Sequence, residues 1–376
     1  MSFVPQNPHK IAFIGGALNS AVGYTHFNAS RLDGHFSVEA GSFSRDNTHN
    51  ENAAHAYGVH PDRCYSDWRQ LLDCEQGVLD AVVVLTPIPS HEEIVLAALD
   101  FGYPVICEKA LGVSSEECGR ISHAVKRNQG FLAVTFNYSG YPMVRELRRM
   151  IAQGRLGKIQ QIHIEMPLEG YLRQKANPQL WRRSDYVVPT VSLDLGAHVH
   201  HLVDFLTGGN RPQRVVGDQA SYGQFEQIVD NVYCLAQYEN DLRVQAWWGK
   251  TALGYRNGLR VRIFGSKGSA EWVQEEPEYL QLADDDGHRL VLDRGSGEAL
   301  IAQHNRYNRF KAGHPSGFTE AFANLYADIA ESLRAYKTLG STSNDYVYGA
   351  DQATAGLVFL EAVSRSALEK NWASVD

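Results

Sequence analysis

The first third of the chain alternates short apolar runs with segments of helical periodicity, and this alternation restricts the fold more than any other feature. Strands are expected in the apolar runs at residues 10–14, 36–43, 79–85, 104–107 and 131–136. Helices are expected between them, at residues 21–32, 52–57, 91–101 and 114–128. Strands that are apolar throughout and alternate with helices form a parallel sheet covered on both faces. We therefore predict an α/β fold for this part of the chain.

After Asn137 the pattern changes to that of an α+β domain. An amphipathic helix is expected over 142–153, and helical segments over 317–336 and 346–370 end the chain. Between them lie segments with the features of antiparallel strands, at residues 159–166, 214–222, 232–238, 242–248, 258–264 and 270–273. These strands predict one large, mostly antiparallel sheet.

Composition excludes several classes of protein. The net charge of -8 argues against non-specific nucleic-acid binding. No apolar run reaches the roughly 18 residues of a membrane span, and the first residues do not resemble a signal peptide. The five cysteines are scattered and odd in number, which argues against a disulfide framework or a thiolate zinc site. We expect a cytoplasmic enzyme with neither nucleic-acid nor membrane partners.

A glycine-containing turn joins the first expected strand to the first expected helix. The segment IGGALNSAVG places Gly15, Gly16 and Ala17 where backbone N–H groups of such a turn bind a diphosphate. The strict G-x-G-x-x-G spacing is absent, so a plain strand-to-helix turn is the alternative. The position in the α/β unit favours a dinucleotide site.

The end of the second expected strand bears on the choice between NAD and NADP. A carboxylate there would bind ribose hydroxyls, and the chain has Ser44, Arg45 and then Asp46, which lies one or two places late. Ser44 and Arg45 could instead meet a 2′-phosphate. These residues leave both cofactors open.

Two further strands end in polar residues, at the edge where open α/β sheets bind ligands. One strand is followed by Thr86-Pro87 and a helix near His91, and the other by Glu108-Lys109. A lysine after a buried strand is commonly a solvated loop residue. Paired with Glu108 at a sheet crevice, Lys109 becomes a candidate acid/base or hydroxyl-orienting group.

The segment DLGAHVHHLVDFL sets three polar residues on an apolar helix. Asp194, His198 and His201 are spaced by four and three residues, so a regular helix would align them on one face. They could be metal ligands, an acid/base pair or core residues with hydrogen-bond partners.

In their order, these motifs resemble those of the Gfo/Idh/MocA oxidoreductases. The family pattern runs from a glycine turn through T-P-x-x-x-H, E-K-P and an N-Y-like pair to D-x-G-x-H. This chain has Thr86-Pro87-Ile-Pro-Ser-His91, Glu108-Lys109-Ala110, Asn137-Tyr138 and Asp194-Leu-Gly196-Ala-His198. The resemblance covers essentially the whole chain, and a later segment, AGHPSGFTEAFANLYADI, is similar to the sugar- and inositol-oxidising branch.

The resemblance implies a Rossmann NAD(P)-binding domain over 1–137 and an α+β domain for substrate binding and oligomerisation over 138–376. It implies a homodimer or homotetramer that oxidises a secondary hydroxyl, such as that at C3, of a sugar, glycoside or inositol. Lys109, Asp194 and His198 fall on the catalytic positions of the family. The implied cofactor residues are Gly15, Gly16, Ala17, Ser44, Arg45, Thr86, Pro87, His91, Glu108, Lys109 and Asn137.

Three departures and three rival functions stay open. Ala110 replaces the family's proline, which predicts a looser turn after Lys109, the glycine turn is irregular, and Lys250 replaces an uncharged residue. The expected substrate contacts are Tyr138, Arg173, Arg182, His201, Lys250 and His314. Two interpretations are open for the lysine and arginine residues among them, together with Lys175 and Arg183: they could bind an anionic sugar, or they could form a solvated basic loop. The rivals are an NAD-dependent glycosidase using Tyr138, His201 or His314 as an extra base, a zinc site on the helix, and a non-catalytic NAD(P) sensor.

Overall fold

The computed structural model describes residues 7–174, 176–340 and 344–376. The chain forms two compact units. The first unit comprises the described parts of Met1–Gly112, Glu116–Gly140 and Phe318–Thr354, and the second those of Val113–Ser115, Tyr141–Gly317 and Ala355–Asp376. Among the described residues, no helix has the length and apolar character needed to cross a membrane.

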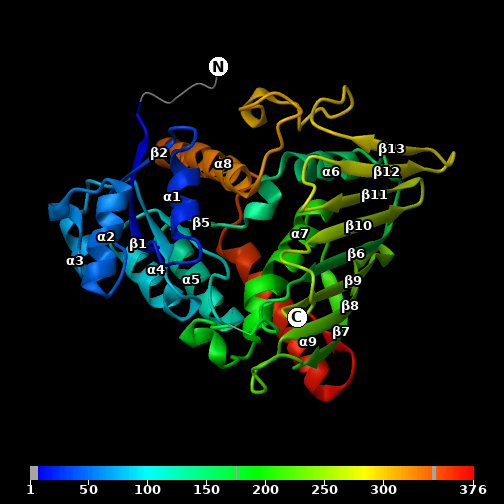
Figure 1. The fold of residues 1–376 in the computed structure, drawn as a ribbon, viewed down its shortest axis with the longest axis horizontal. Coiled ribbons are helices and arrows are strands. Elements are labelled where there is room, and N and C mark those ends of the chain that lie inside the picture. Colours follow the sequence, from blue (N-terminus) through cyan, green and yellow to red (C-terminus); the bar gives the residue numbers. More distant parts are fainter. Residues whose placement is uncertain (1–6, 175, 341–343) are drawn as a thin grey trace. The chain divides into compact units, whose positions relative to one another are not determined.

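The first unit is built on a parallel five-stranded sheet of order β2-β1-β3-β4-β5 (Figure 1). Its strands are β1 (His9–Gly15), β2 (Phe36–Ser42), β3 (Ala81–Leu85), β4 (Val105–Cys107) and β5 (Leu132–Val134). Strands β3, β4 and β5 are buried along their whole length, as their apolar sequences require. The five predicted strands and the parallel sheet are confirmed.

Helices flank this sheet and complete the unit. They are α1 (Gly23–Arg31), α2 (Asn47–Tyr57), α3 (Trp68–Cys74), α4 (His91–Asp100), α5 (Ser115–Arg127) and α8 (Phe318–Leu339). Helix α8 comes from the distant C-terminal part of the chain and packs on α1 (Figure 1). Its Tyr326 lies in one core cluster with Phe27 and Phe36. The two predicted domains, residues 1–137 and 138–376, are each one continuous segment, so they do not include this return of the chain. Helix α3 was not predicted.

The second unit is built on a nine-stranded sheet of order β13-β12-β11-β10-β6-β9-β8-β7-β14. Its strands are β6 (Ile159–Pro167), β7 (Pro212–Ala220), β8 (Asn231–Tyr238), β9 (Arg243–Gly249), β10 (Arg260–Gly265), β11 (Gly268–Val273), β12 (Leu280–Asp284), β13 (Arg289–Leu292) and β14 (Ala373–Ser374). Neighbouring strands are antiparallel except β6 and β9, which are parallel. The mostly antiparallel sheet is confirmed, although β12, β13 and β14 were not predicted.

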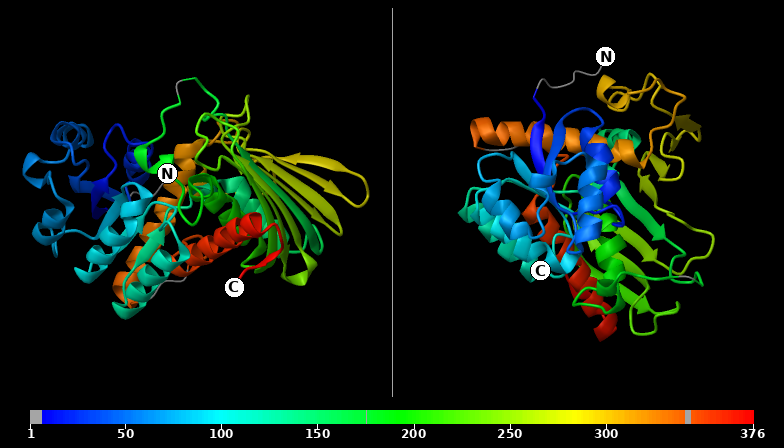
Figure 2. Two further views of the ribbon diagram at one scale, coloured as in Figure 1. Left: turned by 90° about the horizontal axis from the view of Figure 1, so that it is seen from below. Right: turned by 60° about the vertical axis from the view of Figure 1, so that its left-hand side comes forward.

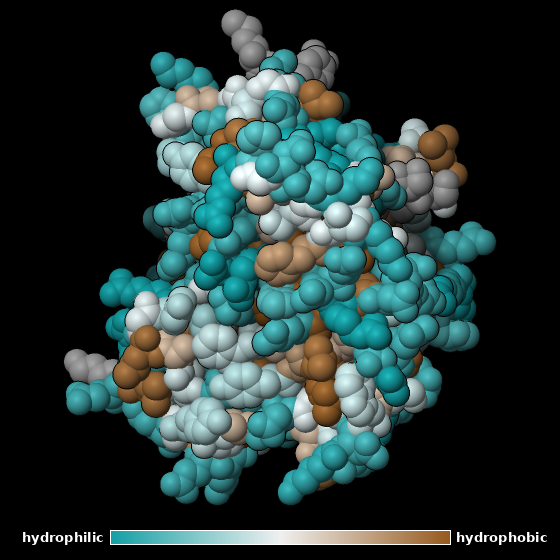
Figure 3. Space-filling model, turned by 90° about the vertical axis from the view of Figure 1, so that its right-hand side faces the viewer, coloured by the Kyte–Doolittle hydropathy of each residue, from teal (hydrophilic) through white to brown (hydrophobic). Residues whose placement is uncertain are grey.

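Helices α6 (Pro142–Ala152), α7 (Ala197–Thr207) and α9 (Ala350–Glu369) lie on one face of this sheet (Figure 2). Alternate residues of the strands point toward them, as in β8, where Val232, Cys234 and Ala236 are buried. The molecular surface on the side of this sheet is mainly hydrophilic, with separate hydrophobic patches (Figure 3). The sheet therefore carries its core on one face only.

Candidate active site

The glycine turn after β1 brings the main chain close to the start of the first helix. Gly15 and Gly16 have φ angles of 83° and 78°, in the region that side chains disfavour. A Cβ atom on Gly16 would lie 2.6 Å from Leu85 Cδ1, and one on Gly23 would lie 2.0 Å from the Gly16 oxygen. Ser20 Oγ accepts hydrogen bonds from the N–H groups of Val22 and Gly23 where α1 begins. Three glycines thus permit the close approach of turn and helix, although their spacing is irregular.

Two buried polar atoms at the strand ends suit a ligand in this unit. Thr86 follows β3, and Asn137 opens the short helix η3 (Asn137–Gly140) after β5. Thr86 Oγ1 and Asn137 Nδ2 are buried, and neither has a hydrogen-bond partner within the described protein. Leaving such groups unpaired costs about 1–3 kcal/mol each, so a ligand that pairs with them would be stabilised. The glycine turn and these atoms together fit a dinucleotide.

The other expected cofactor residues lie beside these groups in sequence. Ala17 is buried in the glycine turn, and Pro87 is exposed after Thr86. Ser44 is half-buried at the end of β2, and Arg45 is exposed. Asp46 accepts a hydrogen bond of 2.9 Å from the His49 N–H and caps α2, so this carboxylate has a structural role.

Glu108, directly before Lys109, is buried in a polar chain that links four elements. Its carboxylate accepts hydrogen bonds from Thr135 Oγ1 and from His26 Nε2, the latter at 3.1 Å. His26 Nδ1 lies 2.7 Å from the hydroxyl of Tyr326 on α8. Burial alone would raise the pKa of Glu108, but the bonds from His26 and Thr135 and the charge of Lys109 hold this pKa below its usual value. Glu108 is therefore fixed as a carboxylate beside Lys109.

His91 joins two strand ends and does not offer a ring nitrogen to a ligand. Its Nε2 lies 2.8 Å from the Thr86 oxygen and its Nδ1 lies 2.9 Å from the Ala110 oxygen. The ring is fully buried, and burial lowers its pKa. Both nitrogens of His91 thus face main-chain oxygens, so its expected contact with the cofactor does not involve a ring nitrogen. The contact with Ala110 also anchors the turn after Lys109. A looser turn was predicted there, because Ala110 replaces the proline of the family pattern.

The polar chain around Glu108 predicts a pH-dependent contribution to stability. Because folding lowers the pKa of Glu108 from its usual 4.5, its stabilising effect is fully present above that pH and is lost as the pH falls below it. Glu108→Gln should lower the free energy of unfolding by about 1–3 kcal/mol at pH 7. Urea unfolding at pH 7 and pH 4 measures this, with the exposed Glu93→Gln as control. A loss that is equal at both pH values would contradict the assignment.

In the second unit, Asp194 lies on a π-helical turn. This turn, η5 (Ser192–Gly196), directly precedes α7, so the regular helix expected from Asp194 to His201 is wrong in its first turn. Trp248 of β9 donates a hydrogen bond of 3.0 Å from Nε1 to Ser192 Oγ. A Cβ atom on Gly196 would lie 3.0 Å from the Trp248 ring, so glycine is needed for this close contact. Single π turns inside helices often mark functional sites.

Two cations converge on the Asp194 carboxylate. Arg182 donates to both oxygens, from Nε at 2.6 Å and from Nη2 at 2.9 Å. Lys250 Nζ lies 2.5 Å from Asp194 Oδ2 and 3.4 Å from the hydroxyl of Tyr171. The side chains of Asp194, Arg182 and Lys250 are 8%, 21% and 11% exposed. A solvated basic loop, one of the two expected arrangements, is therefore wrong for Arg182 and Lys250.

Other basic residues near them in sequence are at the surface. Arg173 is exposed and paired with Glu169, and Arg183 is exposed and donates to Asn177 and to the Pro178 oxygen. Lys175 lies outside the described residues.

The histidines of α7 are buried, at 6% exposed for His198 and 2% for His201. The His201 ring stacks on Phe205 with centroids 5.9 Å apart, and burial lowers the pKa of His201 well below its usual value. This core packing favours a structural role for His201 over the expected substrate contact.

The zinc alternative lacks support, because the one group of potential ligands found to converge among the described residues is Asp284, Asp286 and His288 on an exposed hairpin.

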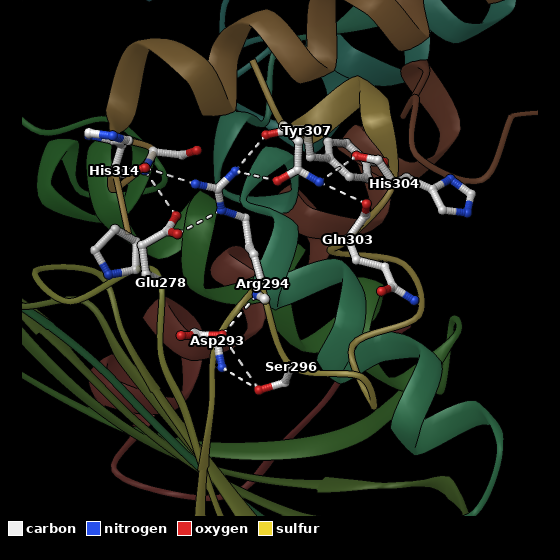
Figure 4. A network of polar contacts seen from close by, with 12 residues as sticks. Glu278, Asp293, Arg294, Ser296, Gln303, His304, Tyr307 and His314 are labelled. Atoms are coloured by element: carbon white, nitrogen blue, oxygen red, sulfur yellow. Dashed lines mark hydrogen bonds and ion pairs between the residues drawn. The ribbon is translucent and has the colours of Figure 1, made fainter. Parts of the chain in front are cut away.

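Tyr138 and His314 differ in their surroundings. Tyr138 is buried in η3, with its ring facing Phe318 of α8. His314 is exposed on a long irregular segment, and hydrogen bonds from Arg294 hold the main chain of this segment in place (Figure 4). Arg294 bonds to Glu278 Oε2 at 2.6 Å, to the Tyr307 oxygen at 2.8 Å and to the His314 oxygen at 2.8 Å. The main chain at His314 is therefore fixed, whereas its imidazole is accessible to solvent.

Both units match models of one protein family. Residues 9–136 match the model described as "Oxidoreductase family, NAD-binding Rossmann fold", and residues 144–271 match the GFO/IDH/MocA C-terminal domain. The chain belongs to the Gfo/Idh/MocA oxidoreductases. The family assigned from the sequence motifs is thus confirmed, and with it the NAD-binding Rossmann domain.

Similar proteins and structures cover nearly the whole chain. The uncharacterized oxidoreductase YfiI of Bacillus subtilis is 30% identical, over 96% of this chain and 95% of that protein. An inositol dehydrogenase homolog from Azotobacter vinelandii, solved with NADH and myo-inositol, is 30% identical with a TM-score of 0.88, over 98% of each chain. Levoglucosan dehydrogenase of Pseudarthrobacter phenanthrenivorans is 26% identical, over 58% of this chain and 61% of that protein.

Proposed function

We propose that this oxidoreductase removes a hydride from a secondary hydroxyl carbon of a sugar, glycoside or inositol and uses NAD as acceptor. The main support is the likeness, at 30% identity over 98% of the chain, to the homolog solved with NADH and myo-inositol. The buried, polar surroundings of Glu108 and Asp194 add to it, because they fix groups at two of the motifs that carry the resemblance.

The proposed reaction converts the alcohol and NAD⁺ into a ketone, NADH and a proton. The bound nicotinamide supplies the acceptor for the hydride. His198 takes the hydroxyl proton, since a neutral imidazole is suited to this near pH 7. Lys109 stabilises the negative charge that develops on the reacting oxygen. Asp194 orients His198 or binds a neighbouring substrate hydroxyl.

Net oxidation is favoured over transient oxidation during glycoside cleavage. The named relatives with an activity are dehydrogenases, and His201, one of the three residues considered as an extra base for cleavage, is packed in the core. Stoichiometric NADH from a sugar or polyol, with no release of an aglycone, is the expected observation.

The cofactor part of the proposal is tested separately from the substrate part. Calorimetry should detect NAD(H) binding to the purified protein, with an affinity in the micromolar range or about −8 kcal/mol. Binding of NADP is measured in the same way, because Arg45 is exposed and could contact a 2′-phosphate. A preference for NADP that Arg45→Ala removes would reverse the choice of NAD, and failure to bind either dinucleotide would refute the proposal.

The substrate is sought by following NADH absorbance with a panel of inositols, sugars, anhydrosugars and glycosides, each paired with its carboxylated counterpart where one exists. We expect oxidation of at least one neutral compound at a rate that depends on protein concentration. If NAD(H) binds but none of these compounds is oxidised, the polyol class is wrong while the cofactor assignment stands.

A further inference from the structure

We propose that Arg182 and Lys250 are positioning residues that hold the Asp194 carboxylate for catalysis and do not receive an anionic group of the substrate. This inference rests on the proposed dehydrogenase function, because it concerns how Asp194 acts there. It also names the substrate class at this position as neutral and rich in hydroxyl groups.

The geometry of the cluster fixes the plane of the carboxylate. Arg182 approaches with two nitrogens, one on each oxygen of Asp194, which is the bidentate arrangement that restricts orientation most. Lys250 Nζ contacts the same Oδ2 atom as Arg182 Nε. The three residues come from separate segments: η4 (Leu180–Arg183), the π turn η5 and the position after β9. Contacts from two other segments therefore restrict this one carboxylate.

The cations have little capacity left for an anion. The Arg182 Nη1 group donates to Gln179 Oε1, and its guanidinium lies over the Trp181 ring at 4.1 Å. Lys250 Nζ also contacts the hydroxyl of Tyr171 and lies 4.9 Å from the centre of that ring. These contacts direct both charged groups toward protein atoms.

The charges around the cluster are also balanced. Burial raises the pKa of the Tyr171 hydroxyl, and the carboxylates of Asp194, Asp185 and Asp230 act in the same direction, against Arg182. Asp185 is bonded by the N–H groups of Thr190 and Val229, and Asp230 by those of Tyr222 and Gly223. Asp194 and these two further carboxylates thus offset the charges of Arg182 and Lys250 around Tyr171, so cations are not in excess there.

Lys250→Met tests the role of Lys250, because methionine keeps a long apolar stem and removes the charge. Misplacing a catalytic group by about 1 Å can cost about 10²-fold in rate. With the best neutral substrate, we expect kcat to fall about 10- to 100-fold and KM to change little. Losing one cation makes the surroundings of Asp194 more negative, so the imidazole that accepts the proton should stay protonated to higher pH and the acid limb of the pH–rate profile should move to higher pH. Lys250→Arg should restore part of the rate.

The matched control is Arg183→Met, which removes an exposed cation next to Arg182. We expect its kcat and pH profile to equal those of the wild type. NAD(H) affinity and the urea unfolding midpoint of each variant show whether the fold is retained. A folded Lys250→Met protein with unchanged kcat and pH profile would overturn the proposal. So would a loss confined to KM for carboxylated substrates, which would identify an anion-binding lysine.

A double-mutant cycle shows whether Lys250 acts through Asp194. In the Asp194→Asn background, Lys250→Met should lower kcat by less than threefold, because the group it positions is already changed. Equal effects in both backgrounds would contradict the proposal. If the wild type oxidises no compound of the panel, the proposed function fails, and the cycle is measured on urea midpoints. A midpoint shift by Lys250→Met that disappears in Asp194→Asn supports the cluster, and an equal shift in both backgrounds overturns it.

Discussion

Lys109→Ala should lower turnover by about 10²–10³ while the protein stays folded. One contact that stabilises developing charge in a transition state is typically worth this much. Lys109 follows the buried strand β4 and the fixed carboxylate of Glu108, and the Ala110 oxygen after it is bonded to His91. The main chain on both sides of the lysine is thus anchored, so loss of its ammonium group is expected to act on the reaction.

The measurement is steady-state oxidation of the identified substrate, with the urea unfolding midpoint as a check on folding. Lys126→Ala is the control, since Lys126 is an exposed lysine of the same unit, paired with Asp351 at the surface. This control should keep the wild-type rate. Turnover of Lys109→Ala within about threefold of wild type would remove Lys109 from the mechanism, whatever happens to cofactor affinity.

Replacing His198 by alanine should cost a similar factor and should also change the pH dependence. The wild-type rate should rise over roughly pH 6–7, where an imidazole loses its proton, and His198→Ala should abolish this rise. Groups that act together are not additive, so Asp194→Ala with His198→Ala should be little slower than either single variant. The pH–rate profiles of the three variants measure both effects.

A variant of an exposed histidine in the same unit, His304→Ala, is the control and should keep the wild-type profile. Packing alone would give a different result for His198→Ala: lower stability and an unchanged rate in the protein that remains folded. Near-wild-type turnover of folded His198→Ala on its true substrate would therefore exclude its role as proton acceptor.

The sheet of the first unit could be predicted from the sequence, because strands that are buried on both faces are apolar along their whole length. The apolar runs of β3 and β4 have no solvent face, and each ends in the polar residues expected at a ligand-binding edge. The order of these strand-end motifs then carried the family assignment. Strands β12 and β13 were missed because they are short, at five and four residues, and because three of the four residues of β13 are exposed.

Within the candidate site, what escaped prediction depends on residues far apart in sequence. Nothing local indicates that Lys250 meets Asp194, which lies 56 positions earlier, or that His26 supports Glu108 across 82 positions. The π turn is equally non-local, because Trp248 and Gly196 make the contact that accompanies it. Spacing therefore identified the polar residues, whereas their partners required the folded chain.

The return of α8 to the first unit has a consequence for synthesis on the ribosome. Tyr326 and Phe322 of α8 pack against an apolar face of α1 and β2. This face stays exposed to solvent until the ribosome has synthesised residues 141–317 and then α8. At about 5–20 residues per second, this leaves apolar side chains such as Phe36 exposed for on the order of ten seconds or more. A nascent chain in this state offers a binding surface to chaperones, and expressing residues 1–140 alone would make that exposure permanent.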